Sequence, residues 1–225
     1  MKNLRNLMFA MVCGLLTVAG LSSCLGDSED DSISADQHRA YGSEMANSYT
    51  GKLRFYKTKS NDASSTSVAV YDSVSTSWRV TTDSIVSISY FPVEKLDSAI
   101  YVSANDQSAA ATKYRALQEA ISNTTPETLK CYYIIPSTSY VSSSTIGFFV
   151  TPWYIQKSLT YNGETHTVYF VFMGNSTYSY GEFSRTNRTF QFNMMLYGIY
   201  EDTVSASNAV SESYFKNIYI SCLAK

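Results

Sequence analysis

Two runs with period-two patterning flank the dipeptide Asn162-Gly163, and this pattern constrains the fold more than any other part of the chain. Residues 153–161 and 164–173 both alternate in the way expected of half-buried strands. An Asn-Gly pair between such runs is the strongest short-range signal of a β-hairpin, because both residues accept the positive φ angles of a type I′ turn. The sequence therefore predicts an antiparallel hairpin with its turn at this pair.

Strand-like patterning continues over most of the chain, and the composition agrees with it. The 19 tyrosines and 11 phenylalanines, with abundant Thr and Val, suit a pleated and half-buried surface. We therefore expect a mainly β fold: a single antiparallel β-sandwich or partly closed barrel of about ten strands, with one or two short helices. The other predicted strands cover residues 50–56, 67–78, 79–90, 129–135, 145–150, 178–183, 189–199 and 214–223.

Two segments have helical signals instead. Ser34 and Gln37 have the spacing of a capping box, which predicts a short helix to about residue 47. A second helix is expected between Asp106 or Ser108, either of which can cap it, and Pro126. Its apolar stripe consists of Ala110, Tyr114, Leu117 and Ile121.

The N-terminus has the three parts of a secretory signal peptide. Lys2 and Arg5 precede an apolar run over residues 7–20, and small residues then lead to Cys24. An uncleaved membrane helix is the alternative, but the run is short of the roughly 20 apolar residues that span a bilayer. We therefore assign residues 1–23 to a signal peptide, residues 24–33 to an acidic tether and residues 34–225 to one β-rich domain.

Cys24 and the acids after it carry a resemblance to exported lipoproteins. The segment Leu21-Ser22-Ser23-Cys24 resembles a bacterial lipobox, which implies cleavage before Cys24 and its acylation, for example with palmitate. The acidic residues 27–31 resemble the export signal of Bacteroidota lipoproteins that reach the outer face of the outer membrane. This resemblance implies a membrane anchor at the outer membrane, with the cell surface favoured over the periplasmic face.

The net charge of the chain limits its expected partners further. The chain has 17 Lys and Arg against 19 Asp and Glu, and loss of Lys2 and Arg5 with the signal makes the remainder more acidic. Nucleic acid is therefore not an expected partner, because binding it requires a clustered basic surface.

Cys131 and Cys222 are the two cysteines after Cys24, and they can form a disulfide or remain small buried hydrophobes.

Motifs for catalysis are scarce. The two histidines, His38 and His166, stand without a Gly-x-Ser-x-Gly elbow or metal-ligand spacing. The sequence therefore predicts no catalytic residue, no metal site and no cofactor. The acids that could act in pairs fall near expected turns or helix surfaces, where solvated carboxylates are the rule; they are Glu94, Asp97, Glu119, Glu127, Glu164, Glu182, Glu201 and Asp202.

Aromatic side chains are the better functional signal. Trp78, Trp153, Tyr154 and Tyr161 could form stacking platforms for a sugar or another amphipathic ligand. The alternative is that such side chains belong to the core and to cross-strand pairs, since strands select aromatic residues in any case.

Several short motifs together resemble a known family. They are Tyr49-Thr50-Gly51-Lys52-Leu53, Thr81-Thr82-Asp83-Ser84, Phe91-Pro92-Val93 and Tyr161-Asn162-Gly163-Glu164-Thr165-His166, combined with the Cys24 tether. The chain resembles a Bacteroidota lipoprotein family classed as a domain of unknown function. The resemblance implies an exported β-rich domain, and it transfers no catalytic residues.

These observations favour a non-enzymatic binding or accessory module of the cell envelope. Its expected partners are the membrane, through the lipid anchor, and a glycan or another envelope protein. Two alternatives stay open: a small glycan hydrolase with paired carboxylates, and a lipocalin-like carrier that holds an apolar ligand inside an open barrel.

Overall fold

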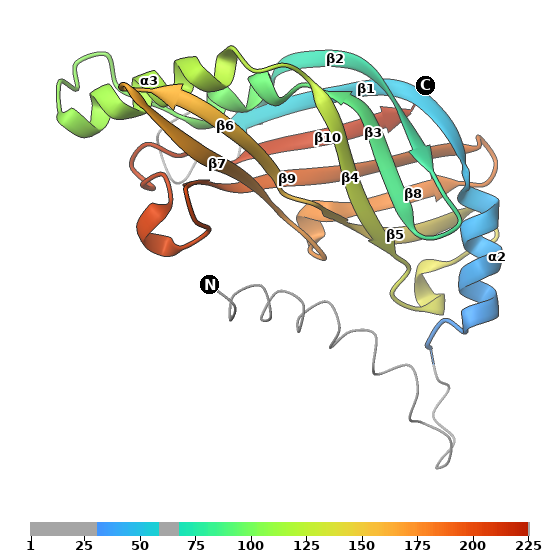
Figure 1. Ribbon diagram of the computed structural model, residues 1–225. Coiled ribbons are helices and arrows are strands. Elements are labelled where there is room, and N and C mark those ends of the chain that lie inside the picture. Colours follow the sequence, from blue (N-terminus) through green and yellow to red (C-terminus); the bar gives the residue numbers. More distant parts are fainter. Residues whose placement is uncertain (1–30, 59–67, 225) are drawn as a thin grey trace. The chain divides into compact units, whose positions relative to one another are not determined.

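The computed structural model describes residues 31–58 and 68–224, and those from Ser32 onward belong to one compact unit (Figure 1). The predicted signal peptide and most of the predicted tether, including Cys24, lie outside the described residues. The helices and strands are α2 (Ala35–Met45), β1 (Asn47–Thr58), β2 (Val68–Val80), β3 (Ile85–Phe91), α3 (Ala109–Ser122), β4 (Glu127–Ile134), β5 (Thr145–Pro152), β6 (Ile155–Tyr161), β7 (Glu164–Met173), β8 (Tyr180–Ser184), β9 (Thr189–Glu201) and β10 (Ile218–Ala224). Short 3₁₀ turns are η2 (Val93–Ala99), η3 (Thr138–Tyr140), η4 (Thr177–Ser179) and η5 (Ala206–Asn208).

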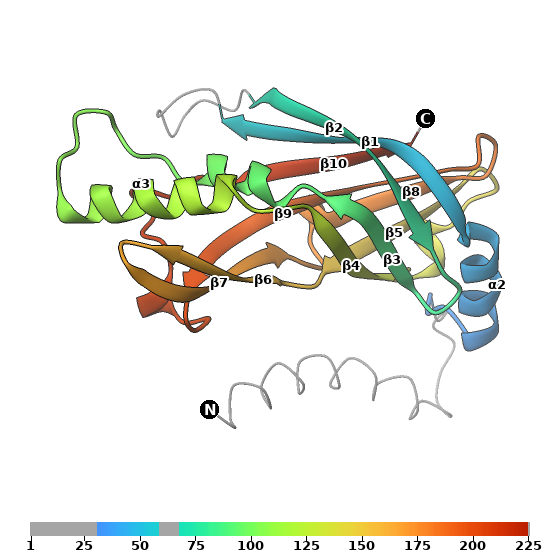
Figure 2. The same ribbon diagram turned by 45° about the horizontal axis from the view of Figure 1, so that its top comes forward.

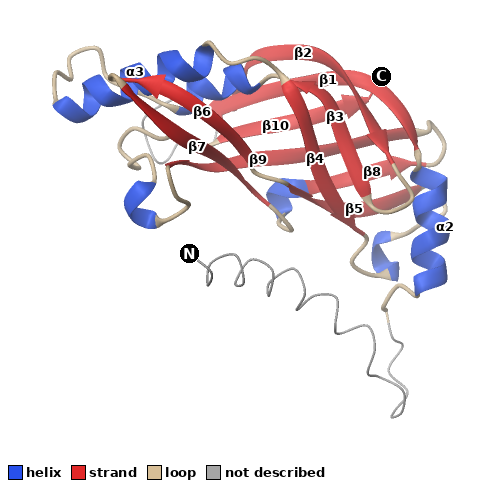
Figure 3. Ribbon diagram, viewed as in Figure 1, coloured by secondary structure: helices blue, strands red, loops and turns tan. Residues whose placement is uncertain are grey.

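The described strands form a single antiparallel sheet that closes on itself. Its order is β10-β1-β2-β3-β4-β5-β8-β9-β7-β6, and β9 also pairs with β10, which closes a barrel of eight strands (Figure 3). The predicted mainly β fold with about ten strands is thus confirmed. Of the two predicted architectures, sandwich or barrel, the chain adopts the barrel.

Strand β9 is the junction between the barrel and an extra hairpin. Near its start, Phe192 pairs with Gly181 of β8 on one edge and with Cys222 of β10 on the other. Further along β9, the pairing with β8 has ended, and on that same edge Leu196 pairs with Phe172 of β7. Strands β6 and β7 therefore extend the sheet beyond the barrel wall.

The predicted Asn-Gly hairpin is confirmed. Tyr161 pairs with Glu164, and the φ angles of Asn162 and Gly163 are 52° and 83°. The predicted starts of two strands were wrong. β3 begins at Ile85 instead of residue 79, and β10 begins at Ile218 instead of residue 214.

Aromatic rings fill the interior of the barrel. The Phe190 ring stacks on Phe148 with centroids 4.3 Å apart, and its centroid lies 5.6 Å from that of Tyr49, 6.1 Å from that of Tyr133 and 5.8 Å from that of Phe192. An eight-stranded barrel has an interior just wide enough for side chains to fill. The interior is thus a packed core of large rings.

Helix α2 lies at one end of the barrel (Figures 1 and 2). Its predicted capping box is confirmed, since the Ser34 hydroxyl accepts from Gln37 N and the Gln37 side chain accepts from Ser34 N. Glu44 forms a two-pronged ion pair with Arg185 after β8, with distances of 3.0 and 3.1 Å. Met45 is fully buried, so the last turn of the helix joins the core.

Helix α3 lies at the opposite end, beside β6 (Figure 2). Ser108 is its N-cap, which settles the choice between Asp106 and Ser108. The buried stripe begins at Ala111, so the predicted start at Ala110 was one residue early. The rest of the stripe is as predicted: Tyr114, Leu117 and Ile121.

Candidate binding groove

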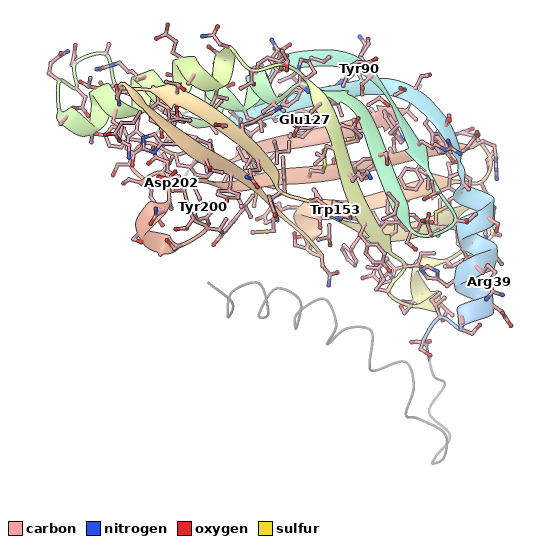
Figure 4. All side chains as sticks on the ribbon, in the orientation of Figure 1. Arg39, Tyr90, Glu127, Trp153, Tyr200 and Asp202 are labelled. Carbon is pink, nitrogen blue, oxygen red and sulfur yellow. The ribbon has the colours of Figure 1, made fainter. Side chains whose placement is uncertain are left out.

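A groove of about 770 Å³ lies on the outer face of β9, next to the loop that follows it. Tyr197 and Tyr200 line it from β9, and Phe215 and Tyr219 line it from the segment that leads into and begins β10. The loop over residues 204–212 completes the lining. Figure 4 labels Tyr200 among the side chains gathered at the end of β9.

A β-bulge directs Tyr197 into the groove. In the β7–β9 ladder Val171 pairs with Gly198 and Phe172 pairs with Leu196, so Tyr197 is an extra residue on β9. Bulges of this kind re-aim a side chain and are common beside binding sites. Tyr197 is 54% exposed, which leaves its ring accessible to a ligand.

Tyr200 occupies space that a side chain at position 198 would need. A Cβ atom at Gly198 would lie 2.7 Å from the ring of Tyr200. The ring is therefore packed along the backbone of its own strand, which limits its motion. Tyr200 and Tyr197 thus present two aromatic surfaces from one strand.

The rest of the lining mixes small apolar residues with polar ones, and few of its residues are charged. Ser205, Ser211 and Asn217 supply hydroxyl and amide groups, and Glu212 and Lys216 are the charged residues in the lining. Such a site combines ring faces with hydrogen-bonding groups that fix a ligand's orientation. It suits a neutral, hydroxyl-rich ligand better than a purely apolar one.

A buried carboxylate supports the end of β9, which corrects the expectation that Glu201 is solvated. Glu201 is buried; its Oε1 accepts from the Tyr161 hydroxyl and its Oε2 accepts from Lys113 Nζ at 2.5 Å. Burial, and then the hydrogen bond between its hydroxyl and Glu201, raise the pKa of Tyr161. Asn208 Nδ2 donates to the Glu201 carbonyl at 2.8 Å, so the same residue also anchors the groove loop.

Asp202 fixes the direction in which the groove loop leaves the strand. Its φ angle is 62°, in the left-handed region. Its Oδ2 accepts from His166 Nδ1 and its Oδ1 accepts from Thr167 N, both at 3.0 Å. The hydrogen bond from His166, followed by that from Thr167, lowers the pKa of the Asp202 carboxyl.

This lowered pKa predicts an acid-sensitive contribution to stability. A carboxyl whose pKa is lower in the folded state stabilises the fold above its unfolded pKa of about 3.9, and that contribution is lost as pH falls through the folded pKa. We expect Asp202→Asn to lower the free energy of unfolding at about pH 6, with the difference from wild type shrinking toward about pH 3. Urea unfolding across this range measures the effect.

Asn tolerates a positive φ angle, so Asp202→Asn removes the charge without straining the backbone. Glu164→Gln is the matched control, because Glu164 lies 3.7 Å from the same histidine but its side chain is 79% exposed. A pH-independent difference between Asp202→Asn and wild type would contradict the role given to this carboxylate.

The four candidate stacking residues separate into two pairs. Trp78 is 1% exposed and lies in the barrel core, and Tyr161 is buried against Glu201. Neither can offer a surface platform. Trp153 and Tyr154 are 53% and 49% exposed in the connection between β5 and β6, so both of their rings are accessible.

Cys131 and Cys222 are both free thiols buried in the barrel, and they do not form a disulfide. Burial raises the pKa of each thiol, strongly disfavouring the thiolate. Cys131 Sγ lies 4.0 Å from Met194 Sδ. Both cysteines therefore pack as small hydrophobes, the second of the two predicted roles.

The described residues offer little that resembles a catalytic centre. His38 Nε2 lies 3.5 Å from Ser84 Oγ, but Ser84 is buried and neither residue lines the groove. Among the described residues, the groove lining includes one carboxylate, Glu212, and the lining of a smaller pocket of about 250 Å³ likewise includes one, Glu182. Paired-carboxylate hydrolysis needs two such groups facing one cleft.

Sequence reasoning missed the groove because half of its lining comes from a segment with weak patterning. Residues 204–212 showed neither period two nor helical periodicity. The one available signal was Tyr197-Gly198 within a strand, since a glycine inside a strand often marks a bulge or a close approach. The contact between His166 and Asp202 had no sequence signal, because 36 residues separate them.

Comparison with known proteins gives a family but no described function. Within the described residues no helix is long and apolar enough to cross a membrane. No curated protein and no solved structure matches the chain. The family described as Domain of unknown function (DUF4840) matches residues 44–201, from the last turn of α2 to the end of β9. This match covers more than half of the chain, which therefore belongs to that family.

Proposed function

We propose that this protein is a lipid-anchored binding module of the bacterial envelope, and that its groove holds a glycan. The observation that carries the proposal is the groove itself, where Tyr197, Tyr200 and Tyr219 meet uncharged polar groups. A sugar ring presents a C–H face that packs on an aromatic ring and hydroxyls that bond around its rim. Tyr suits this role because it combines an apolar body with a polar tip.

The packed barrel interior favours this surface site over an internal one. Phe190 and the rings around it occupy the space that a carrier would keep open for an apolar ligand. Glu212 is the one carboxylate that the described residues contribute to the groove lining, and this favours binding over hydrolysis. Both considerations support a module that binds a glycan and leaves it intact.

A binding screen that also follows turnover tests the proposal. The purified mature protein is titrated with a panel of neutral oligosaccharides: glucans of α and β linkage, xylan fragments and mannan fragments. We expect at least one series to bind and to be recovered unchanged by chromatography. Shortened products would favour the hydrolase instead, and a panel in which nothing binds would contradict the proposal.

The proposed anchor rests on the sequence alone. Cys24 follows a signal-like segment and precedes the acids of residues 27–31, and the family match agrees with the resemblance to a domain of unknown function. We propose that Cys24 is acylated and that the protein belongs to the surface lipoproteins of the Bacteroidota. More than one acyl chain gives stable attachment, whereas a single chain is marginal.

Expression in a Bacteroidota host with labelled palmitate tests the anchor. We expect wild type to incorporate the label and sediment with outer membranes, and Cys24→Ala to lose both properties. Protease added to intact cells then distinguishes the outer face from the periplasmic face. A Cys24→Ala protein that still carries label would contradict lipidation at this residue.

A further inference from the structure

We infer that the ligand of the groove is an extended oligosaccharide that continues past the groove, along a track of aromatic rings, to Trp153. This inference rests on the proposed function and adds the length of the ligand and the path that it takes. The track consists of Tyr200, Tyr169, Tyr154 and Trp153, which lie in β9, β7 and the connection between β5 and β6.

The four residues are neighbours on adjoining segments of the sheet, and the rings of Tyr154 and Tyr169 are in direct contact. Tyr169 and Tyr200 are direct partners in the β7–β9 ladder, so their side chains leave the same face of the sheet, with Cβ atoms about 5 Å apart. The rings of Tyr154 and Tyr169 meet edge to face, with centroids 5.8 Å apart. Trp153 directly precedes Tyr154 in the chain, and both are about half exposed.

Trp153 is held in place at the far end of the track. Its backbone N–H donates to the Lys130 carbonyl at 2.9 Å. Lys130 Nζ lies 5.7 Å from the centroid of the Trp153 indole, within the range of a cation–π contact. Figure 4 labels Trp153 and Tyr200 at separate points of the sheet.

A linear polymer suits this arrangement better than a compact ligand. A short oligosaccharide can fill the groove, but it leaves the rings of Tyr169, Tyr154 and Trp153 uncovered. Successive units of a chain can pack on successive rings, each adding contact area in the same way. Binding should therefore strengthen with chain length until the ligand reaches Trp153.

The chain provides its own reporter for this test. It contains two tryptophans, and Trp78 is buried while Trp153 is half exposed. Collisional quenching of tryptophan fluorescence in the wild-type mature protein therefore reports on Trp153. The probes are disaccharide to octasaccharide members of whichever panel series binds. We expect long members to protect Trp153 from the quencher and short members to bind without protecting it.

Affinity measurements on Trp153→Ala complete the test. The variant should bind disaccharides as wild type does and lose about fivefold or more in affinity for the longest chains. Tyr132→Ala, which removes an exposed ring from β4 outside the track, is the matched control. Saturating long chains that leave Trp153 quenching unchanged would overturn the track while leaving groove binding intact. Failure of every panel member to bind would overturn the proposed function and the track with it.

Discussion

Phe190→Ala should lower the free energy of unfolding by about 3–5 kcal/mol, the usual cost of truncating a buried phenylalanine. Phe190 is fully buried and its ring is in contact with those of Phe148, Tyr49, Tyr133 and Phe192. The cavity left behind would be lined by large rings that are tied to four different strands, so it could not collapse easily. Urea unfolding followed by circular dichroism measures the change.

Tyr132→Ala separates this effect from the loss of any aromatic residue. Tyr132 is 39% exposed on the outer face of β4, and its truncation should cost less than about 1 kcal/mol. Phe190→Leu should fall between the two, because it restores part of the lost volume. Similar losses for Phe190→Ala and Tyr132→Ala would contradict a barrel packed around Phe190.

Gly51→Ala should destabilise the fold by about 3 kcal/mol or more, above the usual range for overpacking, because the clash is with backbone. A Cβ at position 51 would lie 2.0 Å from the Leu223 carbonyl oxygen and 2.7 Å from Trp78 Cη2. The carbonyl belongs to β10, so the methyl group would push apart the β1–β10 pair of the barrel. A glycine-to-alanine change that fits usually stabilises a protein by about 0.4–1 kcal/mol, so the sign of the effect is informative.

Lys52→Ala is the control for Gly51→Ala, because Lys52 is the next residue of β1 and is exposed. It should change the free energy of unfolding by no more than about 0.5 kcal/mol. Hydrogen exchange adds a local readout: in Gly51→Ala the amides of β10 should lose protection first. A neutral or stabilising Gly51→Ala would mean that β1 and β10 are not in the close contact described above.

Local chemistry explains which parts of this fold could be predicted from sequence. The turn at Asn162-Gly163 depends on two residues that accept positive φ, and the capping box of Ser34 and Gln37 depends on a spacing of three. Neither needs any information about the rest of the chain. The number of strands followed for the same reason, because each strand carries its own alternation.

What could not be predicted depends on contacts between distant residues. Closure of the barrel requires β10 to pair with β9 and β1, and alternation alone does not choose partners. The Glu201 side chain was expected to be exposed to solvent. Its burial is possible because Tyr161 and Lys113, which are 40 and 88 residues away in the sequence, donate hydrogen bonds to its carboxylate. The groove depends on a bulge at Tyr197, which shifts the period-two pattern by one residue.

Titration of Tyr197→Ala with the best-binding oligosaccharide tests the central claim most directly. Tyr197 lines the groove and its side chain is largely exposed, so its removal should leave the fold intact. We predict that affinity falls about tenfold, equivalent to about 1.4 kcal/mol, while Tyr132→Ala binds as wild type does. Equal affinities for wild type, Tyr132→Ala and Tyr197→Ala would contradict the claim that this groove is the binding site.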